Sequence, residues 1–203
     1  MMRKLALLVS WLMHPLWMPS YLFLVLAFCA PQMIGDNVPV YIISMMVLIM
    51  TGALPALNLV LFKLLGTIPN LSLYERKDRI MPFMFITMVY AGVTFLFYQQ
   101  YPIPGAFKLL LVTAFAAMTG TLLTFFLKVS IHALSVSAVT TILIMAEASA
   151  FGGNLLWPAV AGVLLSGLVM SARLLLEAHS LNEVFAGAAA GIGVSAAAMI
   201  TLF

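Results

Sequence analysis

Charged residues are scarce in this 203-residue chain. Lysine, arginine, aspartate and glutamate together make up 7% of it, whereas a soluble domain carries about 25%. A soluble fold of this size could not cover its surface with so few charges. Because 65% of the residues are hydrophobic and the mean hydropathy is +1.18, we expect the lipid bilayer to be the solvent of this protein. The formal net charge of +3 is too small and scattered to indicate a nucleic-acid partner.

Other absences narrow the chemistry further. Cys29 is the only cysteine, so no disulfide can form within the chain. The sequence has no carboxylate cluster and no HExxH-type pairing, so it contains no motif typical of a metal site. Its apolar runs are continuous rather than alternating with period two. Backbone groups in lipid must bond to one another, so this pattern predicts membrane helices rather than a barrel.

Seven apolar segments are each near the roughly 20 residues that cross a bilayer. We predict one all-α transmembrane domain over residues 1–203, a bundle of six or seven spanning helices. His14-Pro15 and Pro19 interrupt the first segment, which is therefore either kinked or re-entrant. That segment is too long for a signal-peptide core, and we expect it to be retained. We expect a multi-pass protein of the bacterial inner membrane. The segments cover residues 5–30, 38–62, 80–99, 107–127, 131–151, 155–176 and 184–203.

The connections between segments fall into two alternating classes. Three are short and nearly uncharged: Pro31–Asn37, Gln99–Gly105 and Gly152–Asn154. The other three are polar and basic: residues 63–79, 128–132 and 173–183. Each membrane crossing changes sides, so the three basic connections must lie on the same face. The positive-inside rule would make that face cytoplasmic. If these basic residues form a functional site, however, their position reflects that function as well as the direction of membrane insertion.

The third basic connection has the clearest pattern. His179 and Glu183 are four residues apart and so share a helix face. The carboxylate can fix the imidazole tautomer and leave the other ring nitrogen free to attack. Arg173, just before the turn, can hold an anion with its planar fork. An ion pair between Arg173 and Glu177, with His179 as a polar helix end, is the structural alternative.

The other two connections add weaker patterns. Ser130 and His132 open an apolar helix, where backbone N–H groups favour anions, although Ser130 could simply cap the helix. The run from Glu75 to Arg79 could supply cations to a phosphate or could touch anionic headgroups. Ionisable residues are costly near a membrane core, so their convergence on one face indicates a functional site.

At these residues the chain resembles the type-2 phosphatidic-acid phosphatases, a superfamily of membrane lipid phosphatases related to vanadium haloperoxidases. The family motifs are K-x6-R-P, P-S-G-H and S-R-x5-H-x3-D. The third is matched by Arg173-x5-His179-x3-Glu183, with Glu183 in place of Asp, and the second by Ser130-Ile131-His132. In the first motif, Met81 stands before Pro82 where Arg is usual, and Tyr74 stands at the Lys position. The phosphatase-like core would cover about residues 63–203.

The resemblance implies a metal-independent phosphatase, with no metal and no other cofactor, that hydrolyses a lipid phosphate monoester or a polyprenyl pyrophosphate through a phosphohistidine. His179 would attack phosphorus, Glu183 would orient it, and His132 would protonate the leaving alcohol. The substrate tail would stay in the bilayer while its headgroup enters the site. The phosphate would be bound by Lys77, Arg79, Ser130 and Arg173, with Arg76 a further candidate in the first connection.

Two other functions fit the same residues. The departures in the first two motifs favour a protein that binds lipid phosphate without turnover. Charges inside a helical bundle also suit a small transporter, although the sequence lacks the inverted repeat common in that class. The sequence does not name the lipid, the membrane face of the site or the oligomeric state.

Overall fold

A computed structural model of the chain describes all residues except 36–38, 72, 74, 101–103 and 150–153. The described part is helical and contains no strand. Its elements in chain order are α1 (Met2–Leu12), η1 (Pro15–Trp17), α2 (Met18–Cys29), η2 (Pro31–Met33), α3 (Val40–Val47), η3 (Leu48–Ala53), α4 (Leu54–Leu64), α5 (Arg76–Gln100), α6 (Pro104–Phe126), α7 (Ile131–Ala148), α8 (Leu156–Leu175) and α9 (Leu181–Leu202).

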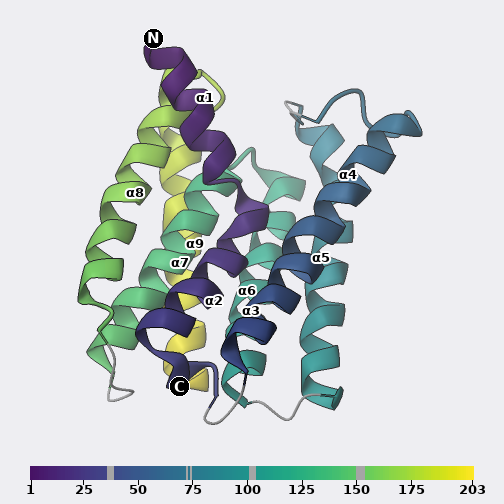
Figure 1. Ribbon diagram of the computed structural model, residues 1–203. Helices are drawn as coiled ribbons and strands as arrows, with labels where there is room; N and C mark the ends of the chain where they lie inside the picture. The colour runs from purple at the N-terminus through teal and green to yellow at the C-terminus, as the bar shows by residue number, and fades with distance from the viewer. Residues whose placement is uncertain (36–38, 72, 74, 101–103, 150–153) are drawn as a thin grey trace.

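Seven stretches of the described chain are long and apolar enough to cross a membrane, which confirms the predicted all-α bundle. The first two are composite: α1, η1 and α2 form one, and α3, η3 and α4 form the next. The remaining five are α5 to α9. Figure 1 shows them running roughly side by side, with the two chain ends at opposite ends of the bundle.

The first span is broken where the sequence predicts an interruption. α1 ends at Leu12, and His14 has extended backbone angles (φ −67°, ψ 138°) before Pro15 begins η1. A residue before proline avoids the helical region, and proline cannot donate the next backbone hydrogen bond. Carbonyl groups at the end of α1 therefore lose their helical donors. One of them, on Leu12, accepts the hydroxyl of Tyr21 at 3.0 Å.

The second span widens into a π-helical turn, η3, just before Pro55. Because Pro55 has no N–H, the carbonyl of Thr51 lacks its usual donor one turn later. The hydroxyl of Tyr90 on α5 supplies that bond, at 3.1 Å. This bond joins the second span to the third.

α9 packs tightly against α7 through small residues. A Cβ atom on Gly187 would collide with the carbonyl oxygen of Ser130, and one on Gly191 would collide with that of Leu134. The glycines let the two backbones meet, as the Gly187-x-x-x-Gly191 spacing predicts. The backbone N–H of Ser130 also donates to the carbonyl of Glu183 at 3.0 Å. The start of α7 and the start of α9 are thereby fixed beside each other.

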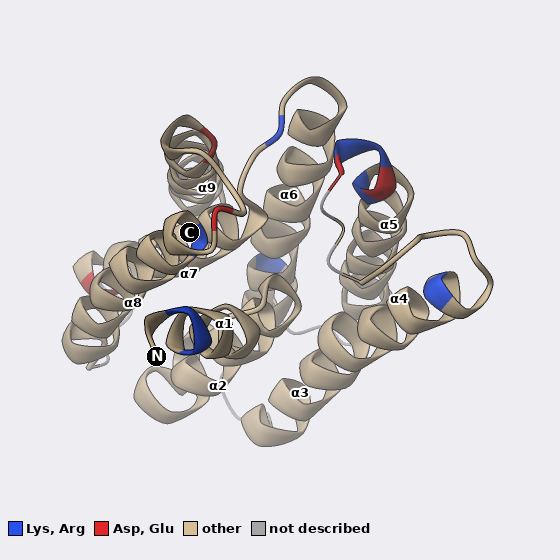
Figure 2. Ribbon diagram, turned by 90° about the horizontal axis from the view of Figure 1, so that it is seen from above, with Lys and Arg blue, Asp and Glu red and all other residues tan. Residues whose placement is uncertain are grey.

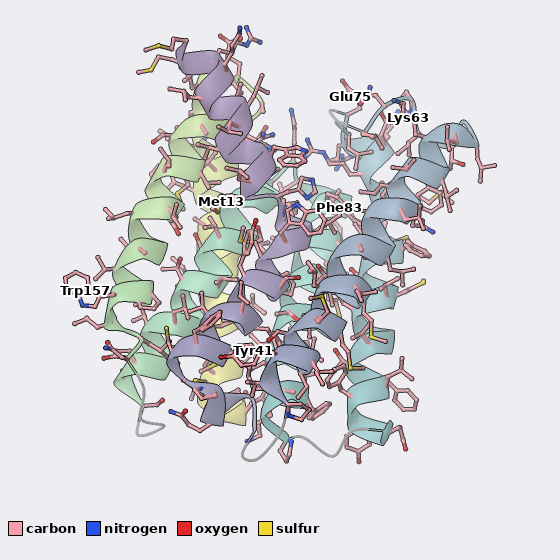
Figure 3. The ribbon with its side chains drawn as sticks, in the orientation of Figure 1. Met13, Tyr41, Lys63, Glu75, Phe83 and Trp157 are labelled. Carbon is pink, nitrogen blue, oxygen red and sulfur yellow. The ribbon has the colours of Figure 1, made fainter. Side chains whose placement is uncertain are left out.

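Charged residues gather at the end of the bundle where the chain begins. Figure 2 looks down on this end, and in Figure 3 Lys63 and Glu75 lie there, across from α1. The three basic connections share this face, as the alternation of connections predicts. At the opposite end the described charged residues are Lys108 and Glu147, and the largest apolar core cluster fills the bundle between α2, α3, α6 and α7.

Candidate active site

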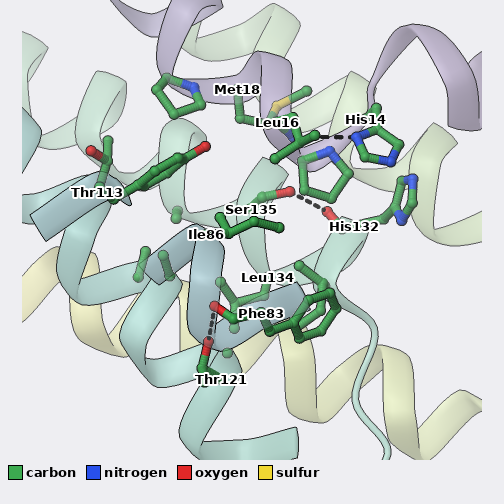
Figure 4. Close-up of a pocket in the computed structure, with 18 of the residues that line it drawn as sticks. His14, Leu16, Met18, Phe83, Ile86, Thr113, Thr121, His132, Leu134 and Ser135 are labelled. Carbon is green, nitrogen blue, oxygen red and sulfur yellow. Dashed lines mark hydrogen bonds between the residues drawn. The ribbon is translucent and has the colours of Figure 1, made fainter. Parts of the chain in front are cut away.

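A cavity of about 160 Å³ opens inside the charged end of the bundle. Its arginine and histidine side chains come from four of the seven spans and one connection: His14, Arg79, His132, Arg173 and His179. Residues from all three basic connections therefore line the same cavity. Figure 4 shows His14 and His132 together on one side of this cavity, with Thr113 on the far side and Ile86 between.

His179 forms the predicted pair with Glu183, but the prediction that both lie on one helix face was wrong, because α9 begins after its cap, Ser180. His179 lies in the connection between α8 and α9, and its Nδ1 is 2.7 Å from Oε2 of Glu183 in the first turn of α9. Because a carboxylate only accepts, Nδ1 carries the proton and Nε2 keeps its lone pair. The His179 side chain is 3% exposed, so its partner and the cavity determine its environment.

The imidazole of His179 is held in its neutral form. Burial lowers the pKa of His179 from 6.5 to about 4, although the hydrogen bond that His179 donates to Glu183 raises this pKa. The positive charges of Arg79 and Arg173 lower the same pKa further. At neutral pH the ring is therefore unprotonated at Nε2, which is the state that a nucleophile requires.

The turn before His179 is strained in a way that orients it. The N–H of Ala178 donates to the carbonyl of Arg173 at 3.2 Å, and Glu177 has a left-handed backbone (φ 54°). This is the pattern of a Schellman helix end, in which glycine usually takes the left-handed position. The motif ends α8 abruptly and turns the chain, so that Arg173 in the last turn and His179 beyond it both reach the cavity.

Arg79 is the cation of the first basic connection that enters the site. It is 7% exposed and lines the cavity from the first turns of α5. Its Nε donates to the carbonyl of Leu73 at 2.6 Å, and one terminal nitrogen donates to the carbonyl of Val129 at 3.4 Å. The second of these bonds ties α5 to the connection before α7. Both bonds hold the guanidinium in a place where it interacts favourably with Glu183.

His132 reaches the cavity from the first turn of α7. Its Nε2 is 3.1 Å from the carbonyl oxygen of Ser10 in α1, and its ring meets that of His14 edge to face, with centroids 5.4 Å apart. Arg173 is close enough to act electrostatically on all three histidines. His14 also caps η1, because its Nδ1 accepts the N–H of Leu16 at 3.4 Å. Its position beside His132 was not predicted.

Two predicted phosphate ligands lie elsewhere. Ser130 is fully buried, and its hydroxyl accepts from the N–H of Ala133 as the cap of α7, which is the structural alternative considered for it. Lys77 is exposed on the outer side of the first turn of α5 and is not part of the cavity lining. The side chain of Arg76 donates to the carbonyl of Phe125 at 3.0 Å. Tyr74 lies outside the described residues.

Beyond the charged residues the cavity continues into the apolar interior. It passes along α7 from His132 to Ile142, a helical distance of about 15 Å. That length is half of the roughly 30 Å hydrocarbon core, which is the depth of one leaflet. Its lining there consists of aliphatic side chains with a few hydroxyl groups, such as Tyr90 and the pair Thr87 and Thr121, whose oxygens are 2.7 Å apart.

Within the described part of the chain, no three side chains of histidine, cysteine, aspartate or glutamate are grouped to hold a metal ion. Comparisons with protein-family models, with curated proteins and with solved structures found no match. The fold and the composition define a multi-pass integral membrane protein whose spans enclose one charged cavity.

Proposed function

We propose that this protein is a metal-independent lipid phosphatase that works through a phosphohistidine. One observation carries the proposal: a histidine hydrogen-bonded to a carboxylate, His179 with Glu183, shares a buried cavity with a second histidine, His132, and with two arginines. A nucleophile, an acid and cations for the phosphate are the parts that phosphoryl transfer to a histidine needs.

The first half of the reaction transfers the phosphoryl group to the protein. Nε2 of His179 attacks phosphorus, and the bond from phosphorus to the alcohol oxygen breaks. His132 gives a proton to that oxygen, so that the alcohol leaves neutral. Glu183 accepts the Nδ1 proton of His179 in a hydrogen bond and stabilises the positive charge that the ring gains.

In the second half, water replaces the histidine. His132, now unprotonated, takes a proton from water, and the hydroxide attacks phosphorus. The bond from phosphorus to Nε2 breaks, inorganic phosphate leaves, and both histidines return to their starting states. The same side chain acts as acid and then as base, which a single well-placed imidazole can do.

Arg79 and Arg173 supply the charge that the phosphate requires. A phosphate monoester carries nearly two negative charges, and each cation at about 4 Å contributes roughly 4 kcal/mol at an effective dielectric near 20, before desolvation. Arg79 is already held by two carbonyl groups, so little reorganisation is needed when the phosphate binds. We assign the phosphate contacts to these two arginines ahead of Lys77 and Ser130.

The apolar part of the cavity supports a lipid as the substrate. A headgroup at the arginines would leave its tail facing the aliphatic lining that extends about one leaflet deep along α7. A cavity of about 160 Å³ is comparable in size to one that takes a single apolar ring, so it suits one slender chain better than two. The start of one tail would therefore lie inside the bundle, rather than the whole tail staying in the bilayer.

The test is phosphate release from a panel of lipid phosphates by the purified protein in EDTA. The panel should include phosphatidic acid, its single-chain lyso form, phosphatidylglycerol phosphate, a lipid A-type phosphate, and a polyprenyl phosphate and pyrophosphate. We expect turnover of at least one of them, and a loss of about 10³-fold or more in His179→Gln. The matched control is Glu147→Gln at the opposite end of the bundle, which should keep the wild-type rate.

Two results would overturn the proposal. Tight binding of these lipids without phosphate release would identify a lipid-phosphate-binding protein with a degenerate site. Ion or solute flux in liposomes that persists in His132→Ala, again without phosphate release, would identify a transporter.

A further inference from the structure

The broken first span meets the site at His132, and no step of the proposed reaction uses that contact. The carbonyl of Ser10 and the ring of His14 both touch this imidazole, and both come from the stretch where α1 gives way to η1. We propose that this stretch positions the acid: Ser10 holds Nε2–H of His132, His14 confines the ring, and Nδ1 is left to face the phosphate. The inference rests on the proposed phosphatase function.

The hydrogen bond with Ser10 assigns the two ring nitrogens of His132. A carbonyl oxygen only accepts, so the nitrogen 3.1 Å from it, Nε2, must carry a proton. Nδ1 has no hydrogen-bond partner within the part of the chain that the structure describes. Because His132 lines the cavity, Nδ1 is the atom that can exchange a proton with the leaving oxygen.

The helix break is what makes the Ser10 carbonyl available. In an uninterrupted helix this carbonyl would accept the N–H of His14, four residues later. The extended backbone of His14 before Pro15 ends the helix and removes that donor. Ser10 lies in the last turn of α1, where the helix dipole is negative, so its carbonyl also favours the positively charged ring that a general acid must form.

The ring of His14 blocks rotation of His132 from the other side. The two rings lie at 82° to each other, in the edge-to-face arrangement that aromatic pairs prefer. His14 is itself fixed, because its Nδ1 accepts the N–H of Leu16 at 3.4 Å. Figure 4 shows this bond and the adjacent ring of His132. The Ser10 hydrogen bond and the His14 ring together restrict rotation of the His132 side chain about its χ1 and χ2 bonds.

A pair of variants separates the ring of His14 from its capping role. His14→Asn keeps a side-chain oxygen that can cap η1 but removes the ring, because asparagine is among the best helix caps. His14→Phe keeps an aromatic edge against His132 but cannot accept from Leu16. If confinement of His132 is the function of His14, the asparagine variant should be the more damaged of the two, and a capping function predicts the reverse.

The readout is the dependence of the rate on the leaving group. An alkyl phosphate, such as a lipid phosphate, needs a proton from the acid, whereas p-nitrophenyl phosphate has a stable leaving group and needs little help. We expect His14→Asn to slow the alkyl substrate by about 10-fold or more and to slow the aryl substrate by less than about threefold. His14→Phe should retain most of the alkyl activity.

A second measurement does not depend on turnover. The chain has three histidines, so nitrogen-15 NMR of histidine-labelled protein, with single-histidine variants for assignment, can report the proton positions of His132. The proposal requires that Nε2 of His132 carry a proton in the wild type, either in the neutral Nε2–H tautomer or in the imidazolium that acts as the acid, and that the neutral ring be a mixture of tautomers in His14→Asn.

Equal slowing of both substrates by His14→Asn, no slowing of either, or an Nδ1–H tautomer of wild-type His132 would overturn the positioning role while leaving the phosphatase intact. A wild-type protein that hydrolyses neither substrate would instead overturn the proposed function, and with it the role of His132 as an acid.

Discussion

The two ends of this bundle use the same kinds of residue differently. At the end without the cavity, Glu147 accepts the backbone N–H of Leu155 at 2.8 Å, and the ammonium of Lys108 lies 5.1 Å from the ring centre of Phe203. Each of these charges serves a local structural contact. At the other end, His132, His179 and the arginines are drawn from distant parts of the chain to one hollow space.

The packing differs in the same way. The largest core cluster fills the end of the bundle near Lys108 and Glu147, whereas the cavity begins at the end near the histidines and reaches this cluster at Val112 and Ile142. A protein that only needed to be stable would gain by filling both ends, because buried apolar contact stabilises and cavities destabilise. A cavity at the charged end is what the proposed binding of a lipid phosphate there would require.

The sharpest test of this contrast compares two neighbouring cations on α5. Arg79 is buried in the cavity and Lys77 is exposed outside it. Arg79→Gln should lower kcat/KM for the lipid phosphate by about 10²–10³-fold, because one preorganised donor to the transferring phosphoryl group is lost. Lys77→Gln should change it by less than about threefold, since exposed substitutions have small effects. Thermal melts would show that both variants remain folded.

If Lys77→Gln lowered kcat/KM more than Arg79→Gln, the phosphate would have to bind outside the cavity. The cavity at the charged end would then not be the phosphate site. Arg79→Lys should lie between the wild type and Arg79→Gln, because it keeps the charge but not the fork that holds two carbonyl groups.

The contact between α7 and α9 gives a second test, with a matched pair on one helix. Gly187→Ala places a Cβ against the carbonyl of Ser130, so α9 must shift and carry Glu183 with it. We expect a destabilisation of about 1–3 kcal/mol from this overpacking. Gly193→Ala is the control, because a Cβ there meets nothing within 4 Å. Melting in detergent, with activity measured in parallel, should show loss in the first variant only. Equal melting temperatures would mean that the close contact is not required.

The pKa of His179 predicts a pH dependence confined to the charged end. Its folded pKa of about 4 lies below the ordinary 6.5, so unfolded chains bind more protons between these values. The stability linked to His179 is therefore complete above about pH 6.5 and is lost as the pH falls towards 4. Between pH 7 and pH 4 the melting temperature of the wild type should fall further than that of His179→Gln. A constant gap between the two curves would contradict the buried, neutral imidazole.

The smallest effects should come from the end without the cavity. Lys108→Met removes one cation–π contact, which is worth about 1 kcal/mol or less, and Glu147→Gln keeps an oxygen that can accept from Leu155. Both should leave phosphate release within about twofold of the wild type. A large loss of activity in either one would show that this end also contributes to function.

The sequence was sufficient for the fold and for part of the site. Apolar run lengths predict the spans, and the alternation of connections places Arg173, His179 and His132 on one face without any knowledge of packing. The four-residue spacing predicts the His179–Glu183 pair, although His179 lies just before α9 and not on a helix face shared with Glu183. These inferences succeed because membrane crossing and helix periodicity are rules of local sequence.

The sequence does not reveal which of the candidate phosphate ligands reach the cavity, because that depends on which face of each helix is buried. Arg76, Lys77 and Arg79 lie within one turn of α5, so they differ only in direction, and spacing does not reveal which direction faces the cavity. Whether Ser130 caps a helix or binds phosphate is likewise decided by its neighbour, Ala133. For His14 one signal existed, since an ionisable residue at a break in a membrane span commonly marks a functional position.

The phosphoryl group itself gives the most direct test of the account. Wild-type protein would be mixed with phosphorus-32-labelled lipid phosphate, quenched within milliseconds in alkali, digested and sequenced by mass spectrometry. We predict an alkali-stable, acid-labile phosphate on the peptide that contains His179, absent in His179→Gln. Phosphate released at the wild-type rate with no label on the protein, or label on a different side chain, would contradict the role assigned to His179.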